Sequence, residues 1–268
     1  MRILMMGTGP FAVPTFEHLL HSQHTLLGLV TRPVPPAKGR RKAPVNPMRD
    51  LAERQGLPIF APQDVNAPAS ITELSQQQAD LLVVCDFGQI LSRDALATAP
   101  RGGINLHASL LPKYRGAAPI NWALYHGESE TGVTVIHMTA RLDGGPCLVR
   151  KRTEIRSEDD AVSLEQRLAG IGVPAVAEAI GLLESWNGTD AIGDMQDPAQ
   201  ATRAPRLKKA DGLVDWHRSA RQICDQVRGL KPWPGTFTTW QDGHGRSVRL
   251  ILDRVSAVPA EHARVDPG

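Results

Sequence analysis

The chain has 268 residues, of which 41% are hydrophobic and only 4% aromatic, so it can bury a sizeable and mainly aliphatic core. Its 30 basic residues nearly balance its 28 acidic residues, and the net charge of +2 says nothing about a nucleic-acid partner. Three scattered cysteines and the lack of an apolar run near 20 residues argue against a disulfide scaffold, a metal site and a membrane span, and favour a cytoplasmic protein.

The first half of the chain alternates short apolar runs with amphipathic stretches. The runs predict strands at residues 2–6, 26–30, 57–60, 81–85 and 103–107. The amphipathic stretches predict helices at residues 11–20, 46–55 and 69–78. This alternation predicts an α/β fold with a doubly wound, mostly parallel, Rossmann-like sheet. Ligands of such sheets bind at the carboxyl ends of the strands.

The second half follows a different pattern. It predicts strands at 133–138 and 147–155, a long helix at 163–183, a second helix at 218–229 and an antiparallel pair at 236–240 and 247–252. Residues rich in Gly, Asp, Pro and Gln separate the two helices. We therefore predict a catalytic domain at 1–188, a linker at 189–205 and a small, β-rich C-terminal module at 206–268. Some 60 residues are close to the lower limit for an independent core.

Asn105 and His107 are the strongest candidates for catalysis. In an extended strand, residues two apart project from the same face, so a carboxamide and an imidazole can point at one reacting group. This pair suits a reaction that builds negative charge on oxygen while a proton moves. The loop that follows holds two prolines and a glycine, as functional loops on rigid scaffolds do. Asp143, in a Leu-Asp-Gly-Gly turn, is the best third partner to orient the imidazole, although such an aspartate is often only a turn residue.

Two other catalytic readings are weaker. Residues 7–12, Gly-Thr-Gly-Pro-Phe-Ala, fit the dinucleotide fingerprint of an NAD(P)-dependent dehydrogenase, but the second strand ends in Thr31-Arg32-Pro33 and not in an acidic residue. A serine hydrolase would need a nucleophile elbow, and no Gly-x-Ser-x-Gly is present. A thiolate nucleophile at Cys85 is disfavoured because the neighbouring Asp86 raises the thiol pKa.

Two basic clusters lie in predicted loops. The first follows the second strand and consists of Lys38, Arg40, Arg41 and Lys42. Such charge runs are usually solvated surface, and the alternative on the ligand side of the sheet is that this one clamps a phosphate backbone. The second lies at the domain junction and consists of Arg203, Arg206, Lys208 and Lys209.

Several motifs together resemble the folate-dependent formyltransferases and, among them, the methionyl-tRNA formyltransferases. The resemblance runs from residue 1 to about residue 254. Its most specific part is Asn-Leu-His-Ala-Ser-Leu-Leu-Pro at 105–112, continued by Arg-Gly-Ala-Ala-Pro-Ile at 115–120. The turn at 142–145 matches the family's leucine-aspartate-x-glycine. Segments at 207–216 and 231–235 are similar to those that join and open the family's C-terminal domain.

This resemblance implies transfer of a formyl group from 10-formyltetrahydrofolate to the amino group of initiator methionyl-tRNA, with Asn105, His107 and Asp143 as the catalytic triplet. It implies a monomer that uses no metal. The implied pterin pocket uses Phe87, Gly88, Gln89, Ile90, Leu91, Leu142 and Gly144. The implied folate channel is lined by Ser109, Leu110, Leu111 and Pro112. The implied tRNA-contacting loop holds Lys38, Arg40, Arg41 and Lys42.

Two departures from the family pattern concern the binding of the tRNA acceptor. The family's C-terminal module is a barrel of roughly 100 residues, so we expect a partial, oligonucleotide-binding-like module here. Val34 follows Arg32-Pro33 where the family has an aspartate. Alternatives that keep the same site are formyl transfer to an amino sugar nucleotide, hydrolysis of formyltetrahydrofolate, and a weakly active RNA-binding protein.

Overall fold

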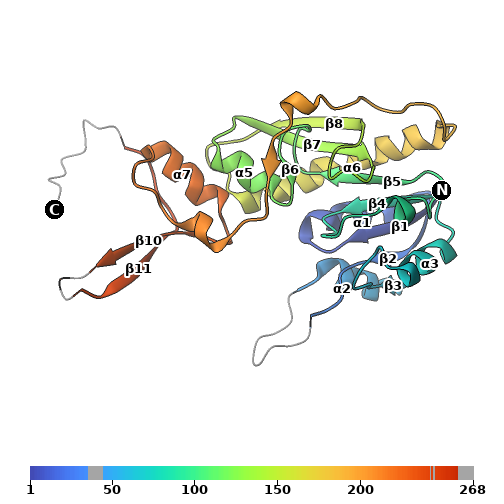
Figure 1. The fold of residues 1–268 in the computed structure, drawn as a ribbon, viewed down its shortest axis with the longest axis horizontal. Coiled ribbons are helices and arrows are strands. Elements are labelled where there is room, and N and C mark those ends of the chain that lie inside the picture. The colour runs from blue at the N-terminus through green and yellow to red at the C-terminus, as the bar shows by residue number, and fades with distance from the viewer. Residues whose placement is uncertain (36–44, 242, 244, 259–268) are drawn as a thin grey trace.

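A seven-stranded mixed sheet forms the body of the protein (Figure 1). The computed structural model describes the chain except residues 36–44, 242, 244 and 259–268. The strand order is β3-β2-β1-β4-β5-β7-β8. The strands β1 to β5 are mutually parallel, and β7 and β8 add to one edge in antiparallel orientation. The predicted mostly parallel, Rossmann-like sheet is confirmed, and its strands are β1 (Arg2–Gly7), β2 (Thr25–Val30), β3 (Ile59–Phe60), β4 (Leu81–Cys85), β5 (Gly103–His107), β7 (Glu130–His137) and β8 (Cys147–Glu154).

Alternation along the strands builds two apolar layers, one on each face of the sheet. In β1, Ile3 and Met5 belong to the larger core cluster, whereas Leu4 and Met6 belong to the smaller one. Because successive side chains of a strand point to opposite faces, a run of apolar residues buries both faces at once. The helices that cover the sheet are α1 (Val13–Leu20), α2 (Pro47–Arg54), α3 (Pro68–Gln76), α4 (Arg93–Leu96) and α6 (Ala161–Ser185).

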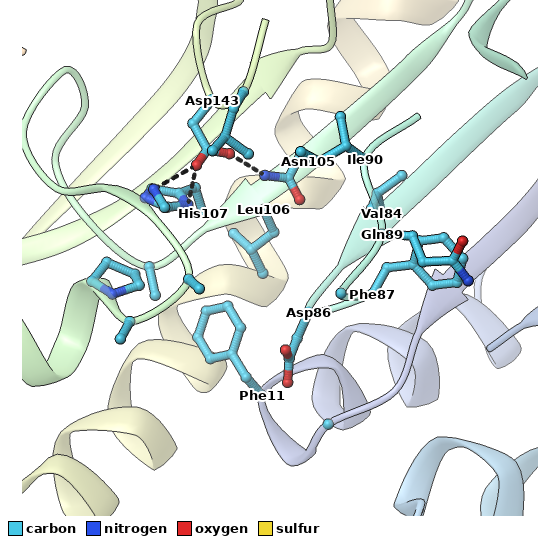
Figure 2. A pocket seen from close by; sticks show the side chains of 18 of the residues that line it. Phe11, Val84, Asp86, Phe87, Gln89, Ile90, Asn105, Leu106, His107 and Asp143 are labelled. Atoms are coloured by element: carbon cyan, nitrogen blue, oxygen red, sulfur yellow. Dashed lines mark hydrogen bonds and ion pairs between the residues drawn. The ribbon is translucent and has the colours of Figure 1, made fainter. Parts of the chain in front are cut away.

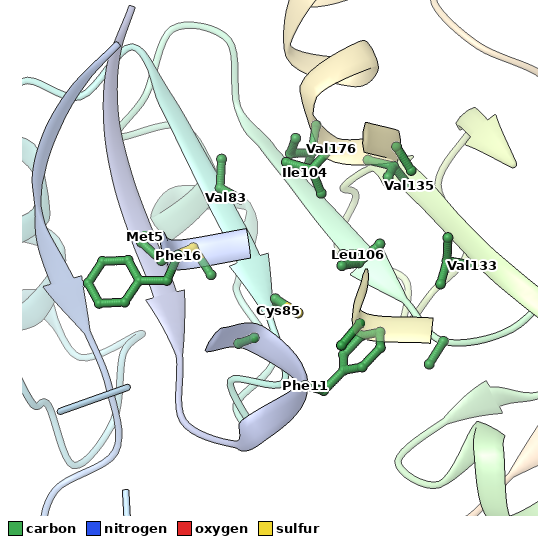
Figure 3. Packing of buried hydrophobic residues seen from close by; sticks show 14 of the residues in the cluster. Met5, Phe11, Phe16, Val83, Cys85, Ile104, Leu106, Val133, Val135 and Val176 are labelled. Atoms are coloured by element: carbon green, nitrogen blue, oxygen red, sulfur yellow. The ribbon is translucent and has the colours of Figure 1, made fainter. Parts of the chain in front are cut away.

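Helix α6 is the longest element and covers the sheet over β5, β7 and β8 (Figure 3). It begins with a capping box at Asp160 and Ser163. Its apolar side lies in the larger core cluster, where Val176 packs near Ile104 (Figure 3). By length and composition α6 could cross a membrane, and 44% of its apolar window is buried inside this protein.

The C-terminal module packs against α5 (Pro119–Tyr125) through α7 (Ala220–Gly229). Asn121 of α5 donates a hydrogen bond to the carbonyl of Gly229, 2.8 Å away. The hairpin of β10 (Thr236–Gln241) and β11 (Ser247–Leu252) is antiparallel, as predicted, and extends away from the sheet (Figure 1).

The segment predicted as a linker contains structure of its own. β9 (Arg203–Ala204) pairs in parallel with β6 (Arg115–Gly116), which lies in the loop after the Asn105/His107 strand. Three short 3-10 turns complete the fold: η1 (Pro10–Ala12), η2 (Pro198–Gln200) and η3 (Lys209–Gly212). Two-residue strands paired across nearly 90 residues leave no local period in the sequence, so pattern reading does not find them. The domain boundaries stay a prediction.

Candidate active site

One cavity of about 650 Å³ opens at the carboxyl ends of β4 and β5. It also reaches Thr8 and Gly9 after β1, where doubly wound sheets hold their ligands, because the chain passes from β1 to β2 on one side and from β4 to β5 on the other. Asn105, His107 and Asp143 all line it. The apolar part of the wall includes Val84 and Leu106, so the cavity combines a dry surface with a few polar groups (Figure 2).

Asp143 connects the two polar side chains of β5 (Figure 2). Its Oδ1 accepts a hydrogen bond of 3.4 Å from Asn105 Nδ2, and its Oδ2 lies 3.7 Å from His107 Nδ1. Oδ2 also accepts a 2.8 Å hydrogen bond from the backbone N–H of Gly116. The predicted triplet therefore converges at one place, although Asp143 is 36 residues or more away along the chain.

The imidazole of His107 makes a hydrogen bond at one nitrogen and faces a carboxylate with the other. The ring is buried, and Nε2 donates to the backbone carbonyl of Tyr114 at 2.9 Å. A carbonyl only accepts, so Nε2 carries a proton and Nδ1 is the atom that faces Asp143. With an acceptor at each nitrogen, the ring is oriented to carry a second proton when the reaction requires it. This arrangement suits a proton carrier beside a neutral amide donor.

The Asp143 turn has a left-handed backbone conformation and is held in place by a buried glutamine. Asp143 has φ 48°, a left-handed conformation that aspartate and asparagine tolerate better than most residues. Gln196 Nε2 donates to the carbonyls of Asp143 and Gly145, at 2.8 and 2.7 Å. Arg115 in turn donates to Gln196 Oε1 at 3.1 and 2.7 Å. Gln196 belongs to the segment predicted as a linker, and no local signal marks it as part of the site.

The end of the cavity beyond Asn105 holds most of the predicted pterin pocket. All five residues predicted after β4 line it, and Phe87 and Leu91 are buried there. The side-chain amide of Gln89 makes hydrogen bonds with the backbone of residues 62 and 65, so this residue forms part of the cavity wall. Leu142 lines the cavity, whereas Gly144 is not among the lining residues. This end of the cavity therefore combines apolar side chains with nearby backbone groups. The lining residues predicted here are Phe87, Gly88, Gln89, Ile90, Leu91 and Leu142.

The predicted folate-channel residues Ser109, Leu110, Leu111 and Pro112 do not line the cavity. Ser109 is buried and its hydroxyl donates to the carbonyl of Lys113 at 2.7 Å. Leu111 packs in a separate small cluster with side chains of β7 and β8. The strand ends at His107, and in the loop that follows Ser109 and Leu111 point into the protein. A folate-binding role for these four residues stays a prediction.

The two predicted basic clusters differ in whether the structure describes them. Lys38, Arg40, Arg41 and Lys42 lie outside the described residues. From the second basic cluster, Arg206 lines the cavity together with Leu207 and Trp233 of the C-terminal module. Within the described ranges, no three His, Cys, Asp or Glu side chains gather as metal ligands.

The glycine-rich turn after β1 is explained without a dinucleotide. A Cβ on Gly9 would lie 1.7 Å from the carboxylate of Asp86, and a Cβ on Gly7 would lie 2.9 Å from the carbonyl of Cys85. These glycines allow close packing against the end of β4. A carboxylate on this turn also repels the pyrophosphate of a dinucleotide, so the geometry argues against the dehydrogenase reading. Burial, with a smaller effect of Asp86, raises the pKa of the Cys85 thiol, as expected for an inert cysteine.

Comparison with known proteins identifies the family. Residues 1–180 match the family described as formyl transferase, and residues 206–268 match the formyl transferase C-terminal domain. The methionyl-tRNA formyltransferase of Rhodopirellula baltica is 50% identical over 245 residues, which cover 89% of this chain and 73% of the relative. The enzyme of the same name from Geobacter metallireducens is 42% identical over 92% of this chain and 78% of its own. The chain belongs to the methionyl-tRNA formyltransferase family.

Solved structures share the fold at much lower identity. A 4-N formyltransferase from Francisella tularensis has a TM-score of 0.70 at 14% identity, covering 96% of this chain and 98% of its own. HypX from Aquifex aeolicus in complex with tetrahydrofolic acid has a TM-score of 0.64 at 16% identity, over 89% of this chain and 36% of that one. They confirm the Rossmann-like formyltransferase fold.

Proposed function

We propose that this protein transfers the formyl group of 10-formyltetrahydrofolate to the α-amino group of initiator methionyl-tRNA, with Asn105, His107 and Asp143 as its catalytic residues. The observation that carries the proposal is the convergence of these three side chains on one cavity, in a chain up to 50% identical to methionyl-tRNA formyltransferases. Transfer is direct, without a covalent enzyme intermediate.

Asn105 and His107 divide the work of the reaction. Asn105 donates a hydrogen bond from its side-chain amide to the formyl oxygen as negative charge builds on that oxygen. The hydrogen bond that Asn105 makes to Asp143 is long, at 3.4 Å, and is easily exchanged for this one. His107 moves the proton between the attacking amine and the leaving nitrogen of the folate. The Tyr114 carbonyl fixes the direction of the ring through Nε2, and the carboxylate of Asp143, 3.7 Å from Nδ1, stabilises the charged ring.

The folate is proposed to bind with its pterin ring between the segment after β4 and the Asp143 turn. Phe87, Leu91 and Leu142 offer the apolar contacts, and the backbone around them offers hydrogen-bond partners. The far end of the cavity reaches Arg206 and Trp233 of the C-terminal module. An acceptor that enters there contacts both parts of the protein, which suits a large substrate such as tRNA better than a free sugar nucleotide.

A formylation assay tests the function. The protein is incubated with initiator methionyl-tRNA and 10-formyltetrahydrofolate, and formylmethionyl-tRNA is the expected product. Parallel reactions contain an amino sugar nucleotide or no acceptor. Formylation of the sugar with none of the tRNA would select the sugar enzyme, and folate turnover without an acceptor would select the hydrolase.

The predicted basic loop contributes affinity for the tRNA phosphates in this proposal. Replacing Arg40, Arg41 and Lys42 together by glutamine is expected to raise the KM for tRNA and to flatten its dependence on salt, because fewer counterions are released on binding. The KM for the folate serves as the internal control and should not change. Monomeric state and cytoplasmic location stay predictions.

A further inference from the structure

Asp86 is an acidic residue of the cavity for which the proposed mechanism has no role. It directly follows β4 and has φ 47°, a left-handed conformation. Its carboxylate is exposed to the cavity on one side and packs against the backbone of Gly9 on the other. Among the residues that the structure describes, none donates a hydrogen bond to this carboxylate. An unpaired carboxylate inside a binding cavity has its hydrogen-bonding capacity available to a ligand.

Asp86 lines the same cavity as the catalytic pair. Val84 of β4 lies opposite Asn105 of β5, and Asp86 follows the end of β4 at the same edge of the sheet. Figure 2 shows Asp86 beside Phe11, with Leu106 between them and the triplet. A small group seated over Leu106 therefore has Asp86 on one side and Asn105 and His107 on the other.

The charges around Asp86 favour a cation at this position. Glu165 of α6 lines the same cavity, and Arg32, after β2, lies at its rim. Burial first, and then the charge of Glu165, raises the pKa of Asp86 to about 6, while Arg32 opposes the shift. Burial likewise raises the pKa of Glu165. The remaining titratable neighbour, the thiol of Cys85, is neutral because its own pKa is raised. Two carboxylates that repel each other stabilise a cation bound between them.

We propose that Asp86 binds the ammonium form of the acceptor's α-amino group and removes one proton from it before formyl transfer. This inference rests on the proposed function. An α-amino group titrates near pH 7.7–8.0, so at neutral pH most of it is protonated and cannot attack. One N–H bond breaks, its proton passes to the Asp86 carboxylate, and its electron pair stays on nitrogen. That pair then forms the bond to the formyl carbon, and the bond from this carbon to N10 of the folate breaks. His107 passes the second amine proton to the leaving N10, and Asp86 returns its own proton to water.

The test is the pH dependence of Asp86→Asn. Asparagine keeps the shape of the side chain and tolerates the left-handed backbone, so the fold should survive. For methionyl-tRNA we expect kcat/KM to fall roughly 10- to 100-fold at pH 6.5, the range for a lost hydrogen bond to a charged group. At pH 9 the amine is already neutral, and the loss should shrink to about threefold or less. The dissociation constant of the folate should not change.

Two further variants separate this role from a structural one. Asp94→Asn, at an exposed position of α4 outside the cavity, is the matched control and should leave the profile unchanged. Glu165→Gln should move the acidic limb of the profile to lower pH, because removal of a negative neighbour lowers the pKa of Asp86. An equal loss for Asp86→Asn at every pH, or weaker folate binding, overturns the inference alone. An inactive wild type overturns the proposed function as well.

Discussion

Replacement of Asp143 by asparagine tests the electrostatic role assigned to this residue. Both side chains have nearly the same shape, and asparagine also tolerates φ 48°. The substitution removes the negative charge beside His107 and leaves a single acceptor oxygen, which either Gly116 or Asn105 can use. Because the turn is also held by Gln196 through two backbone carbonyls, the local geometry should persist.

The distance between the two groups sets the size of the effect. Opposite unit charges 3.7 Å apart attract by about 4 kcal/mol at an effective dielectric constant of about 20, which suits the low exposure of Asp143 and His107. If His107 carries a second proton in the transition state, that attraction lowers the barrier only in the wild type. We therefore expect kcat to fall about 10³-fold in Asp143→Asn.

Single-turnover formylation of methionyl-tRNA at saturating folate measures this change. The melting temperature should stay within a few degrees of the wild type, whereas Asp143→Ala should lower it, since alanine is strained at this φ and leaves the N–H of Gly116 without its acceptor. A kcat within about tenfold of the wild type, in a folded Asp143→Asn protein, would refute the charge-stabilisation argument.

Four further substitutions probe the site and its support. Asn105→Ala should lower kcat about 10²–10³-fold with little change in folate affinity, and equal losses in both would show that Asn105 is structural. Gly116→Ala should destabilise the protein by about 2–4 kcal/mol in denaturant titrations, because the new methyl group would lie 2.4 Å from a carbonyl of β9 at φ 129°. Arg167 lowers the pKa of Asp159, so Asp159→Asn should cost about 2 kcal/mol near pH 7, and this difference should fade as the pH falls below about 4. Asp86, whose pKa is raised to about 6, destabilises the fold when charged, so Asp86→Asn should melt higher than the wild type at pH 8 and equally at pH 4.

Pattern reading succeeded where the signal is local. The strands at 81–85 and 103–107 have the predicted bounds, because runs of apolar residues between turn residues can be read directly. The Asn105/His107 pair followed from the two-residue repeat of a strand, and the strained Asp143 turn from its glycines. Ser109 follows the end of this strand, and the loop directs its hydroxyl to the carbonyl of Lys113.

The sequence by itself determined the order of the main strands and helices, the placing of Asn105 and His107 on one face of a strand, and the family. Tertiary structure alone decided which distant residues complete the site. Gln196 reaches the Asp143 turn beside an isolated bridge between Asp194 and Cys147, and Asp86 lines the same cavity as Asn105 and His107 because β4 and β5 are neighbouring strands. Periodicity reports which face a residue takes within its own element. Periodicity does not predict which elements lie side by side, because their arrangement depends on packing over the whole sheet.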